Sequence, residues 1–405
     1  MKNAMKRTFV SGLAAFYGVW AAPAAQAYSF NEIVSDVRQP VAVSGGSTCP
    51  VRSHRLTAAG SIAMRWSTAL GTNPVTILTQ NQTASGRLNE IEQVITAALG
   101  VWTGVSGTML VPASLAPLTR TANATSCGTN GLNSICFDQP DGAFTPGVLA
   151  FTRVITADQI GMQLSNGPAA TQVGQILDAD VYFNPGDSRV TFATPAALPG
   201  AQSAYDLESV LTHELGHSLG FSHSAVWSAM MYPFAPAPGT IAGTRPSTQQ
   251  PDAPLGEDDR TGLRVLYPDA TDTVHAGSIQ GRILPANPLS LPGAPPGVTG
   301  IFGSHVVAVD SASGTVIGGI IGGWSCTAPG PVQFDGNYEI DRLPVGQSYT
   351  VYAEPLNGAV DPSQVSNATA SLCRNPTTDP GWPPLQGCVV PAVETSFTTR
   401  TRPGP

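Results

Sequence analysis

The densest group of residues able to do chemistry is the segment HELGHSLGFSH, residues 213–223. On a helix, His213 and His217 lie one turn apart on the same face, so their imidazole nitrogens can bind one metal ion. Gly220 can adopt the positive φ that ends a helix, which would bring His223 back as a third ligand. Three neutral histidines leave a coordination position open for water, which is typical of catalytic rather than structural zinc. The segment therefore predicts one catalytic zinc ion.

Glu214 follows the first of these histidines and should project beside the metal ligands. A carboxylate in that place can accept a proton from water and pass it to a leaving amine, and no nucleophilic side chain is then required. The predicted reaction is hydrolysis of peptide bonds inside a chain, with Glu214 as the general base.

Three helices and several strands are expected to position this segment. One helix should begin after Asp206, a good N-cap, and end at Gly220. Apolar residues at three- and four-residue spacing predict an earlier helix from Leu88 to Trp102, packed on a sheet. A third helix is expected from about residue 257 to 267, before Pro268. Strand-like runs lie at residues 108–111, 148–154 and 176–183. The fold class is therefore α+β.

The residues after the third histidine carry a resemblance to a known family. Ser224 follows His223 directly, and SAMMYP spans residues 228–233. The sequence resembles the metzincin metallopeptidases and, within them, the matrixins of bacterial type, whose zinc motif continues in Ser and is followed by a tight methionine turn. The resemblance implies a twisted mixed sheet with long helices, and a methionine beneath the zinc ligands.

Two registers of this methionine turn are open. Matrixin-like spacing selects Met231, followed by Tyr232 and Pro233, whereas a serralysin-like pattern selects Met230. We prefer Met231, because Ser224 and the Tyr-Pro pair resemble the matrixins. Tyr232 is a candidate fifth zinc ligand or donor to the transition state.

The resemblance covers about residues 55 to 268. GVLAFT resembles the matrixin edge strand, which implies that Val148, Leu149, Ala150 and Phe151 lie along an extended, antiparallel peptide substrate. The segment from Met231 to Pro236 would wall the pocket for the residue after the cut, and residues 234–256 would form the specificity loop.

Two departures concern further metals. Matrixins of the animal type place structural-zinc histidines where this chain has Phe151 and Asp180, so we expect no second zinc. Asp178, Asp180 and Asp187 are candidates for calcium, against the alternative of ordinary surface carboxylates. The other histidines are expected to be surface or satisfied core residues: His54, His275 and His305.

The N-terminus and the charge predict a secreted protein. Lys2, Lys6 and Arg7 precede an apolar stretch, and AQA at residues 25–27 fits a cleavage site, so residues 1–27 are expected to be a signal peptide. Their removal changes the net charge from −8 to −11 and leaves no lysine. Such a chain should not bind nucleic acid. No later stretch is long and apolar enough to span a membrane. We expect an extracellular monomer, with the periplasm as the alternative location.

Six cysteines in an exported chain favour disulfides. Cys127 and Cys136 bracket a Gly- and Asn-rich loop, which predicts a local bridge. The pairing of the other four stays open, and the thiolate of one of them, Cys49, could instead cap the zinc of a proenzyme. These four are Cys49, Cys326, Cys373 and Cys388.

The C-terminal part alternates short strand-like runs, and Asp335-Gly336 signals a hairpin turn. Its GxYxIxxLPxGxxYxV pattern resembles carboxypeptidase regulatory-like and collagen-adhesin repeats, which implies an all-β sandwich accessory domain. The expected order is a signal peptide (1–27), an extension (28–49), a peptidase domain (50–268), a linker (269–276) and the sandwich (277–405). A secreted endopeptidase acting on proteins or peptides is preferred over a surface-binding protein with a vestigial peptidase fold, because the base and all three histidines are intact.

Overall fold

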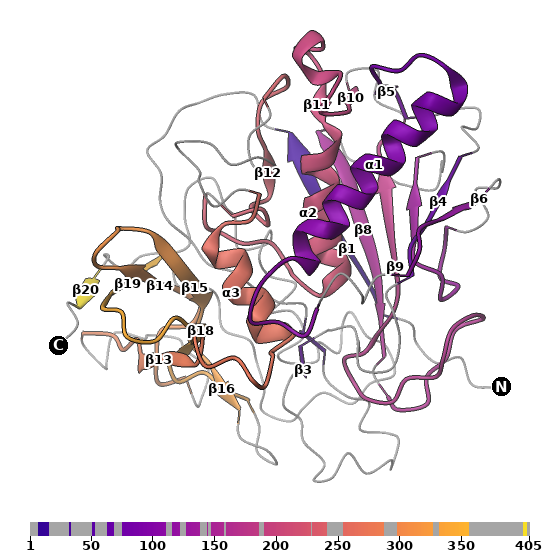
Figure 1. The fold of residues 1–405 in the computed structure, drawn as a ribbon. Helices are drawn as coiled ribbons and strands as arrows, with labels where there is room; N and C mark the ends of the chain where they lie inside the picture. Colours follow the sequence, from indigo (N-terminus) through magenta and orange to yellow (C-terminus); the bar gives the residue numbers. More distant parts are fainter. Residues whose placement is uncertain are drawn as a thin grey trace.

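Most of the chain between residues 63 and 355 is described by the computed structural model (Figure 1). The described residues are 7–15, 32–33, 51–52, 63–68, 75–110, 116–121, 127–137, 144, 147–157, 159–185, 190–227, 229–240, 254–286, 298–326, 332–355 and 400–402. Within them, no helix combines the length and the apolarity that crossing a bilayer requires.

A seven-stranded mixed sheet lies at the centre of the N-terminal part, in the order β12-β1-β8-β9-β7-β4-β6 (Figure 1). β8 and β9 run antiparallel, with Phe151 opposite Tyr182 and Arg153 opposite Asp180, whereas β7 runs parallel to β9 and to β4. The strands are β1 (Arg7–Ala15), β4 (Arg65–Ser67), β6 (Thr119–Thr121), β7 (Ser134–Cys136), β8 (Val148–Thr156), β9 (Ile176–Phe183) and β12 (Phe234–Ala235).

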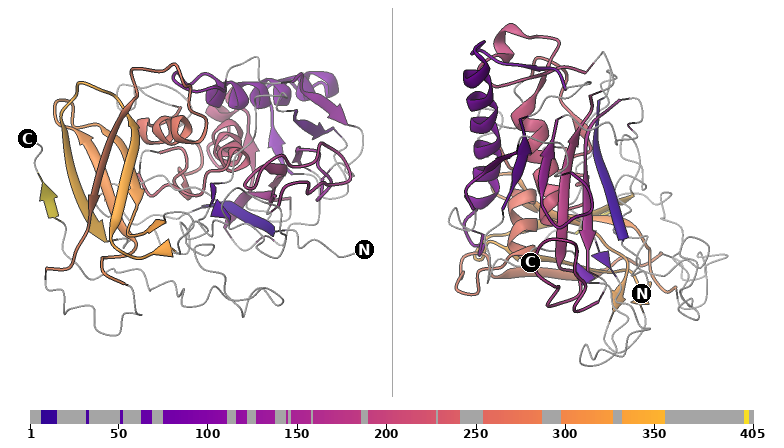
Figure 2. Two further views of the ribbon diagram at one scale, coloured as in Figure 1. Left: turned by 90° about the horizontal axis from the view of Figure 1, so that it is seen from below. Right: turned by 90° about the vertical axis from the view of Figure 1, so that its right-hand side faces the viewer.

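Two helices pack on one face of this sheet, α1 (Ala84–Thr103) and α2 (Leu207–Leu219), as the right-hand view of Figure 2 shows for α1. The indole of Trp102 on α1 donates to the main-chain oxygen of Thr212 on α2 at 2.9 Å. Both helices and β8 contribute side chains to one buried apolar core, which excludes water from the sheet face. Its members include Ile91, Ile95, Trp102, Leu149, Ala150, Leu211 and Leu215.

The helix that carries the histidines begins and ends as its sequence predicts. The Asp206 side chain accepts a hydrogen bond from the main-chain nitrogen of Glu208 at 3.2 Å. Gly220 ends the helix with φ at +111°, a conformation that is strained for residues with a Cβ. The hydroxyl of Tyr267 donates to the carbonyl oxygen of Leu219 at 2.6 Å, so one carbonyl of the last turn is satisfied.

Short elements complete the N-terminal part. A three-stranded sheet in the order β11-β10-β5 lies at the start of α2, and β2 pairs with β3. Their bounds are β2 (Glu32–Ile33), β3 (Val51–Arg52), β5 (Ile77–Leu78), β10 (Phe192–Ala193), the 3-10 helix η3 (Leu198–Gly200) and β11 (Tyr205–Asp206). The strand expected at residues 108–111 is wrong for its described part, residues 108–110, where Thr108 makes only an isolated bridge, to Pro268.

The C-terminal part contains a four-stranded sheet in the order β15-β14-β19-β20 and the separate pairs β13-β18 and β16-β17. Side chains from β14, β15, β18 and β19 share a buried cluster that includes Val306, Ile317 and Ile340. The strands are β13 (Gly277–Arg282), β14 (Ser304–Asp310), β15 (Val316–Ile321), β16 (Ser325–Cys326), β17 (Val332–Gln333), β18 (Asn337–Leu343), β19 (Tyr349–Pro355) and β20 (Arg400–Arg402). A sandwich stays a prediction.

The hairpin predicted at Asp335-Gly336 is wrong in its pairing. Gly336 has φ at +81°, as a turn requires, but β17 before it pairs with β16 and β18 after it pairs with β13. A turn motif predicts only the local backbone conformation. Strand pairing depends on contacts between residues that are far apart in the sequence.

The third helix, α3 (Glu257–Leu266), lies between the two parts of the chain (left-hand view of Figure 2). It contacts β15 and β18 on one side, and its Asp259 binds the methionine turn of the N-terminal part on the other. The predicted helix over residues 257–267 is thus confirmed, and it packs against the C-terminal sheet.

The strand expected at the edge of the sheet, β8, is covered in the full-length chain. β1 runs antiparallel along it, from Arg7 opposite Thr156 to Ala14 opposite Val148, and continues parallel to β12. An open strand edge pairs readily with an extended segment, because its N–H and C=O groups lack partners. The signal peptide expected to be removed therefore includes a strand of the sheet, and its removal stays a prediction.

Candidate metal centre

Three buried histidines converge at the end of α2. His213 and His217 come from successive turns of the helix, and His223 returns after Gly220. One side-chain nitrogen of each lies within 4.8 Å of the others. Their exposed fractions are 1%, 0% and 7%, so the surrounding protein shields all three rings from water. These three histidines, which the spacing of the motif predicts as ligands, thus lie where they could hold one metal ion.

Main-chain carbonyls orient two of the rings. His213 Nδ1 lies 2.7 Å from the oxygen of Met230, and His217 Nδ1 lies 2.9 Å from the oxygen of Phe221. Because a carbonyl only accepts, both Nδ1 atoms carry the proton, and both Nε2 atoms of the neutral rings present a lone pair. These two Nε2 atoms are 3.1 Å apart. Two lone pairs at that distance repel unless they share a cation, so the donor set fits a metal ion such as zinc.

Burial keeps the rings neutral. It lowers the pKa of His213 to about 3, with a further contribution from the charge of His223. Burial also lowers the pKa of His217 well below its usual value, followed by the effects of His213 and His223. Neutral imidazole is the form that binds a metal, so protonation competes weakly with the ion near neutral pH.

Glu214 is fully buried beside the histidines and contacts the sheet. Its Oε2 accepts a 2.7 Å hydrogen bond from the hydroxyl of Thr152 on β8, and the same hydroxyl lies 2.9 Å from the main-chain oxygen of Glu214. Thr152 is a site residue that the sequence analysis missed. It is the last residue of GVLAFT and follows Phe151, the last of the four residues assigned to substrate; only the packing of α2 on β8 brings it to Glu214.

A carboxylate from α3 holds the methionine turn. Asp259 accepts hydrogen bonds from the main-chain nitrogens of Met230 at 2.6 Å and Met231 at 3.1 Å, and from that of Gly256 at 2.9 Å. It is fully buried, and burial raises its pKa to about 6. Asp259 was also missed, since nothing in the local pattern of a closing helix shows that it reaches the turn.

The two methionines differ in what they contact. Met231 is fully buried under α2 at Gly216, where a Cβ would lie 2.2 Å from Met231 Sδ and 2.8 Å from the Trp102 ring. Gly216 lies between His213 and His217 in the sequence, so Met231 packs against the part of α2 that carries both histidines. Met230 is 8% exposed and contributes its main-chain oxygen to His213.

Tyr232 lies in a row of aromatic rings. Its ring centroid is 5.2 Å from that of Trp227 and 5.6 Å from that of Phe234 on β12. Trp227 is 64% exposed, whereas Tyr232 is buried, and burial raises the pKa of its hydroxyl. The row extends along the segment that the family resemblance assigns to the substrate pocket.

The four residues assigned to the substrate strand lie on β8 with different surroundings. Leu149 and Ala150 are in the main core, and Val148 is half-buried. Phe151 stacks on Tyr182 with centroids 4.9 Å apart, beside the Cys127–Cys136 disulfide. The ring of Phe151 is buried in this small apolar cluster.

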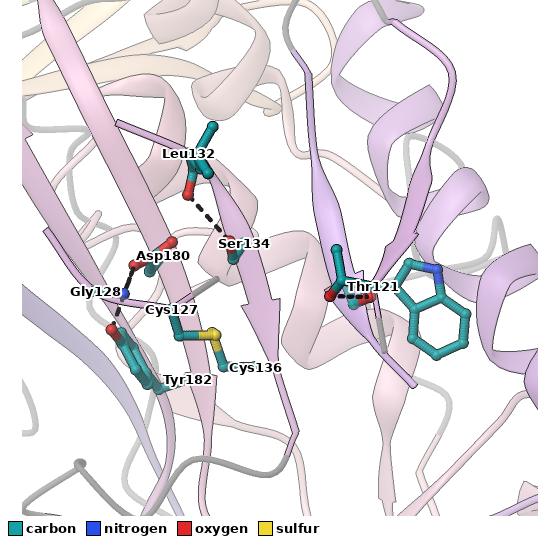
Figure 3. The surroundings of a disulfide bond; sticks show 9 residues. Thr121, Cys127, Gly128, Leu132, Ser134, Cys136, Asp180 and Tyr182 are labelled. Atoms are coloured by element: carbon teal, nitrogen blue, oxygen red, sulfur yellow. Dashed lines mark hydrogen bonds between the residues drawn. A yellow bond between two sulfur atoms is a disulfide. The ribbon is translucent and has the colours of Figure 1, made fainter. Parts of the chain in front are cut away.

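The disulfide predicted between Cys127 and Cys136 is present, and Figure 3 shows it near Asp180 of β9. Its loop bonds to two carboxylates of this strand. Asp180 Oδ2 accepts from the main-chain nitrogen of Gly128 at 2.6 Å, and Asp178 Oδ2 accepts from that of Asn130 at 2.8 Å. The surface position that we considered for Asp178 and Asp180 is wrong, since they are 1% and 2% exposed. Burial, and then the charge of Asp178, raise the pKa of Asp180 to about 8. A calcium site here stays a prediction.

Two of the remaining histidines pair with carboxylates. His275 Nδ1 lies 2.8 Å from Asp272, and the buried His305 has its Nδ1 2.8 Å from Glu354. Several predictions fall outside the described residues, or on a side chain that is not described: His54, Cys49, Asp187, the pairing of Cys326, Cys373 and Cys388, and most of the specificity loop.

Comparison with known proteins supports the assignment of this region. Residues 152–268 match the family model for Matrixin. The chain is 34% identical to Metalloendoproteinase 1-MMP of Arabidopsis thaliana over 113 residues, which is 25% of this chain and 28% of that protein. It is 40% identical to Matrix metalloproteinase-18 of Xenopus laevis over 105 residues, covering 26% of this chain and 18% of the relative.

A third relative matches over a shorter length. Identity to Matrilysin of Rattus norvegicus is 40% over 68 residues, 17% of this chain and 22% of the other. The chain thus spans less than a third of the length of these relatives. The matched segment holds Thr152 and all three histidines, and these likenesses support a matrixin-like metallopeptidase.

Proposed function

We propose that the chain is a secreted zinc-dependent endopeptidase that hydrolyses internal peptide bonds of proteins, with Glu214 as the general base. The observation that carries the proposal is the pair of Nε2 atoms of His213 and His217, 3.1 Å apart, with a buried carboxylate on the same helix. A vestigial fold has no reason to keep this arrangement, which favours an enzyme over a surface-binding protein.

Different residues of the chain have different roles in the proposed hydrolysis. When bound by His213, His217 and His223, a zinc ion would supply the Lewis acidity that activates a water and polarises the scissile carbonyl. Glu214 accepts the proton of the attacking water and delivers it to the leaving amine. Thr152 holds the carboxylate of Glu214 in place, and Met231 supports the ligand histidines from below. Tyr232 is a candidate donor to the transition state.

The substrate is proposed to add as an extended strand along β8. The position of β1 supports this, because a segment of the chain itself pairs antiparallel with β8 and parallel with β12. Main-chain hydrogen bonds to the substrate then supply affinity that does not depend on its sequence. Alternate side chains of the substrate enter pockets, which supply specificity. The segment from Met231 to Pro236 would wall the pocket after the cut and favour an apolar residue.

The proposal is tested by exchanging Glu214 for the isosteric amide. Glu214→Gln should keep one zinc per chain and lose hydrolysis of an unfolded protein by a factor on the order of 100 or more. Glu208→Gln, a change on the first turn of the same helix, is the matched control and should keep full activity. Loss of zinc together with activity would remove Glu214 from the role of base, and activity that persists after prolonged chelation would exclude the zinc mechanism.

A further inference from the structure

One carboxylate of α3 connects the metal centre to the C-terminal sheet. Asp258 Oδ2 accepts a 2.8 Å hydrogen bond from the hydroxyl of Ser224, the residue after the third histidine. Its other oxygen, Oδ1, accepts a 3.0 Å hydrogen bond from the main-chain nitrogen of Gly319 on β15. Asp258 is 1% exposed and Ser224 is fully buried, so these bonds are shielded from water. A hydrogen bond to a charged group in such surroundings is among the stronger ones.

The contact between α3 and β15 lies along the free edge of the C-terminal sheet. β15 is the terminal strand of its sheet and pairs only with β14 among the described strands. On an edge strand, alternate residues direct both N–H and C=O away from the sheet. Gly319 donates its N–H to Asp258, and Ile317, two residues earlier, accepts at its carbonyl from the Thr261 hydroxyl at 2.9 Å.

Asp258 and Thr261 are three residues apart on α3 and so lie on one face of the helix. Asp258 supplies a hydrogen-bond acceptor and Thr261 a donor, which replace the C=O and N–H groups of a neighbouring strand. α3 therefore completes the edge of the C-terminal sheet with two side chains.

The hydrogen bond between Asp258 and Ser224 connects α3 to the loop that carries His223, the third predicted ligand. The main-chain nitrogen of Ser224 donates to Met231 at 2.7 Å, and its hydroxyl accepts from the nitrogen of Val226 at 2.9 Å while donating to Asp258. A displacement of Asp258 would therefore move the residue next to His223 and the methionine turn together. Among the described residues, the Thr261 side chain bonds to Ile317 and has no hydrogen bond to the ligand loop.

We propose that Asp258 is a positioning residue that couples the edge of the C-terminal sheet to the metal centre, a role that rests on the proposed function. Docking of β15 on α3 then orders the loop of His223, and metal binding in turn secures the edge of β15. Coupling of this kind is reciprocal, because each site changes the free energy of the other by the same amount.

The test measures hydrogen exchange in the full-length chain, zinc-loaded and after chelation. In the wild type, zinc should slow exchange of the segment that contains Gly319. Ser224→Ala cuts the link on the metal side, so it should abolish this effect of zinc and weaken zinc binding about tenfold. Thr261→Val is the matched control: it should speed exchange in both states and keep the effect of zinc.

Two results would overturn the coupling: no effect of zinc on β15 in the wild type, or the same effect in Ser224→Ala. Both readouts are independent of hydrolysis. A chain that shows the coupling but digests no protein would refute the peptidase function and leave the coupling standing. A chain that digests protein without the coupling would refute the coupling alone.

Discussion

The hydroxyl of Thr152 on β8 lies 2.7 Å from Oε2 of Glu214 on α2, and both residues are fully buried. The hydroxyl can donate only one proton, and the carboxylate is its charged acceptor. This contact joins the strand along which substrate is proposed to lie to the base that would act on it, so the orientation of the carboxylate depends on the packing of the helix on the sheet.

Thr152→Val should therefore lower kcat about tenfold while zinc content and KM stay unchanged. Valine keeps the shape and removes the hydroxyl, and a hydrogen bond to a charged group contributes about 1.5 to 3 kcal/mol. Steady-state kinetics on a short peptide give the split between kcat and KM. Thr152→Ser restores the donor and should recover most of the rate; a valine variant with full activity would show that Thr152 has no part in positioning the base.

The two methionines should differ in stability cost. Met231→Ala empties a fully buried site beneath Gly216 and should lower the free energy of unfolding by about 2 to 5 kcal/mol, because it leaves a cavity. Met230→Ala should cost less, since the hydrogen bonds of Met230 to His213 and Asp259 use only its main chain. Urea unfolding of the two variants gives the ranking, and the reverse order would support the serralysin-like register.

Removal of the N-terminal segment should increase activity. Arg7–Ala15 covers β8, so a chain that begins at Tyr28 should cleave a short peptide at least tenfold faster than the full-length chain. A tethered strand competes at an effective concentration of about a millimolar. The free peptide RTFVSGLAA should inhibit the shorter chain competitively and a scrambled peptide should not; equal rates for both chains would mean that this strand leaves the site accessible.

Stability should depend on pH through Asp180. Burial raises its pKa from the ordinary value of 3.8 to about 8, so between these two values the folded chain keeps a proton that the unfolded chain releases. Stability from this group therefore falls as pH rises from about 4 to about 8. Asp180→Asn removes the titration and can still accept from Gly128, so its stability relative to the wild type should increase over this range.

Urea unfolding with the disulfide intact, at pH 5 and pH 8, measures this difference. Asp310→Asn is a suitable control, because it removes a carboxylate on an exposed turn, where hydrogen bonds from the Ala312 nitrogen and the Ser313 hydroxyl lower the pKa of Asp310. Its relative stability should not increase with pH. An Asp180→Asn variant that follows the wild type at both pH values would refute the raised pKa.

Features that depend on neighbours within a few residues could be predicted from the sequence. The cap at Asp206, the stop at Gly220 and the one-turn spacing of His213 and His217 are properties of a single helix. The strand at Ile176–Phe183 was predicted with its observed bounds because its run of aliphatic and aromatic residues is short and is interrupted only by Asp178 and Asp180. The short Cys127–Cys136 bridge was predictable for the same reason.

Contacts between residues far apart in the sequence could not be predicted, because they depend on how the elements pack. Thr152 is 62 residues from Glu214, Asp258 is 34 from Ser224, and Gly319 is 61 from Asp258. Periodicity shows which face of a helix or strand is buried, but it does not show what that face contacts. The burial of Asp178 and Asp180 under the disulfide loop, and the pairing of β18 with β13, depend in the same way on packing between segments. Burial then sets the chemistry, because a carboxylate or an imidazole removed from water acquires its pKa and its orientation from the partners that the fold provides.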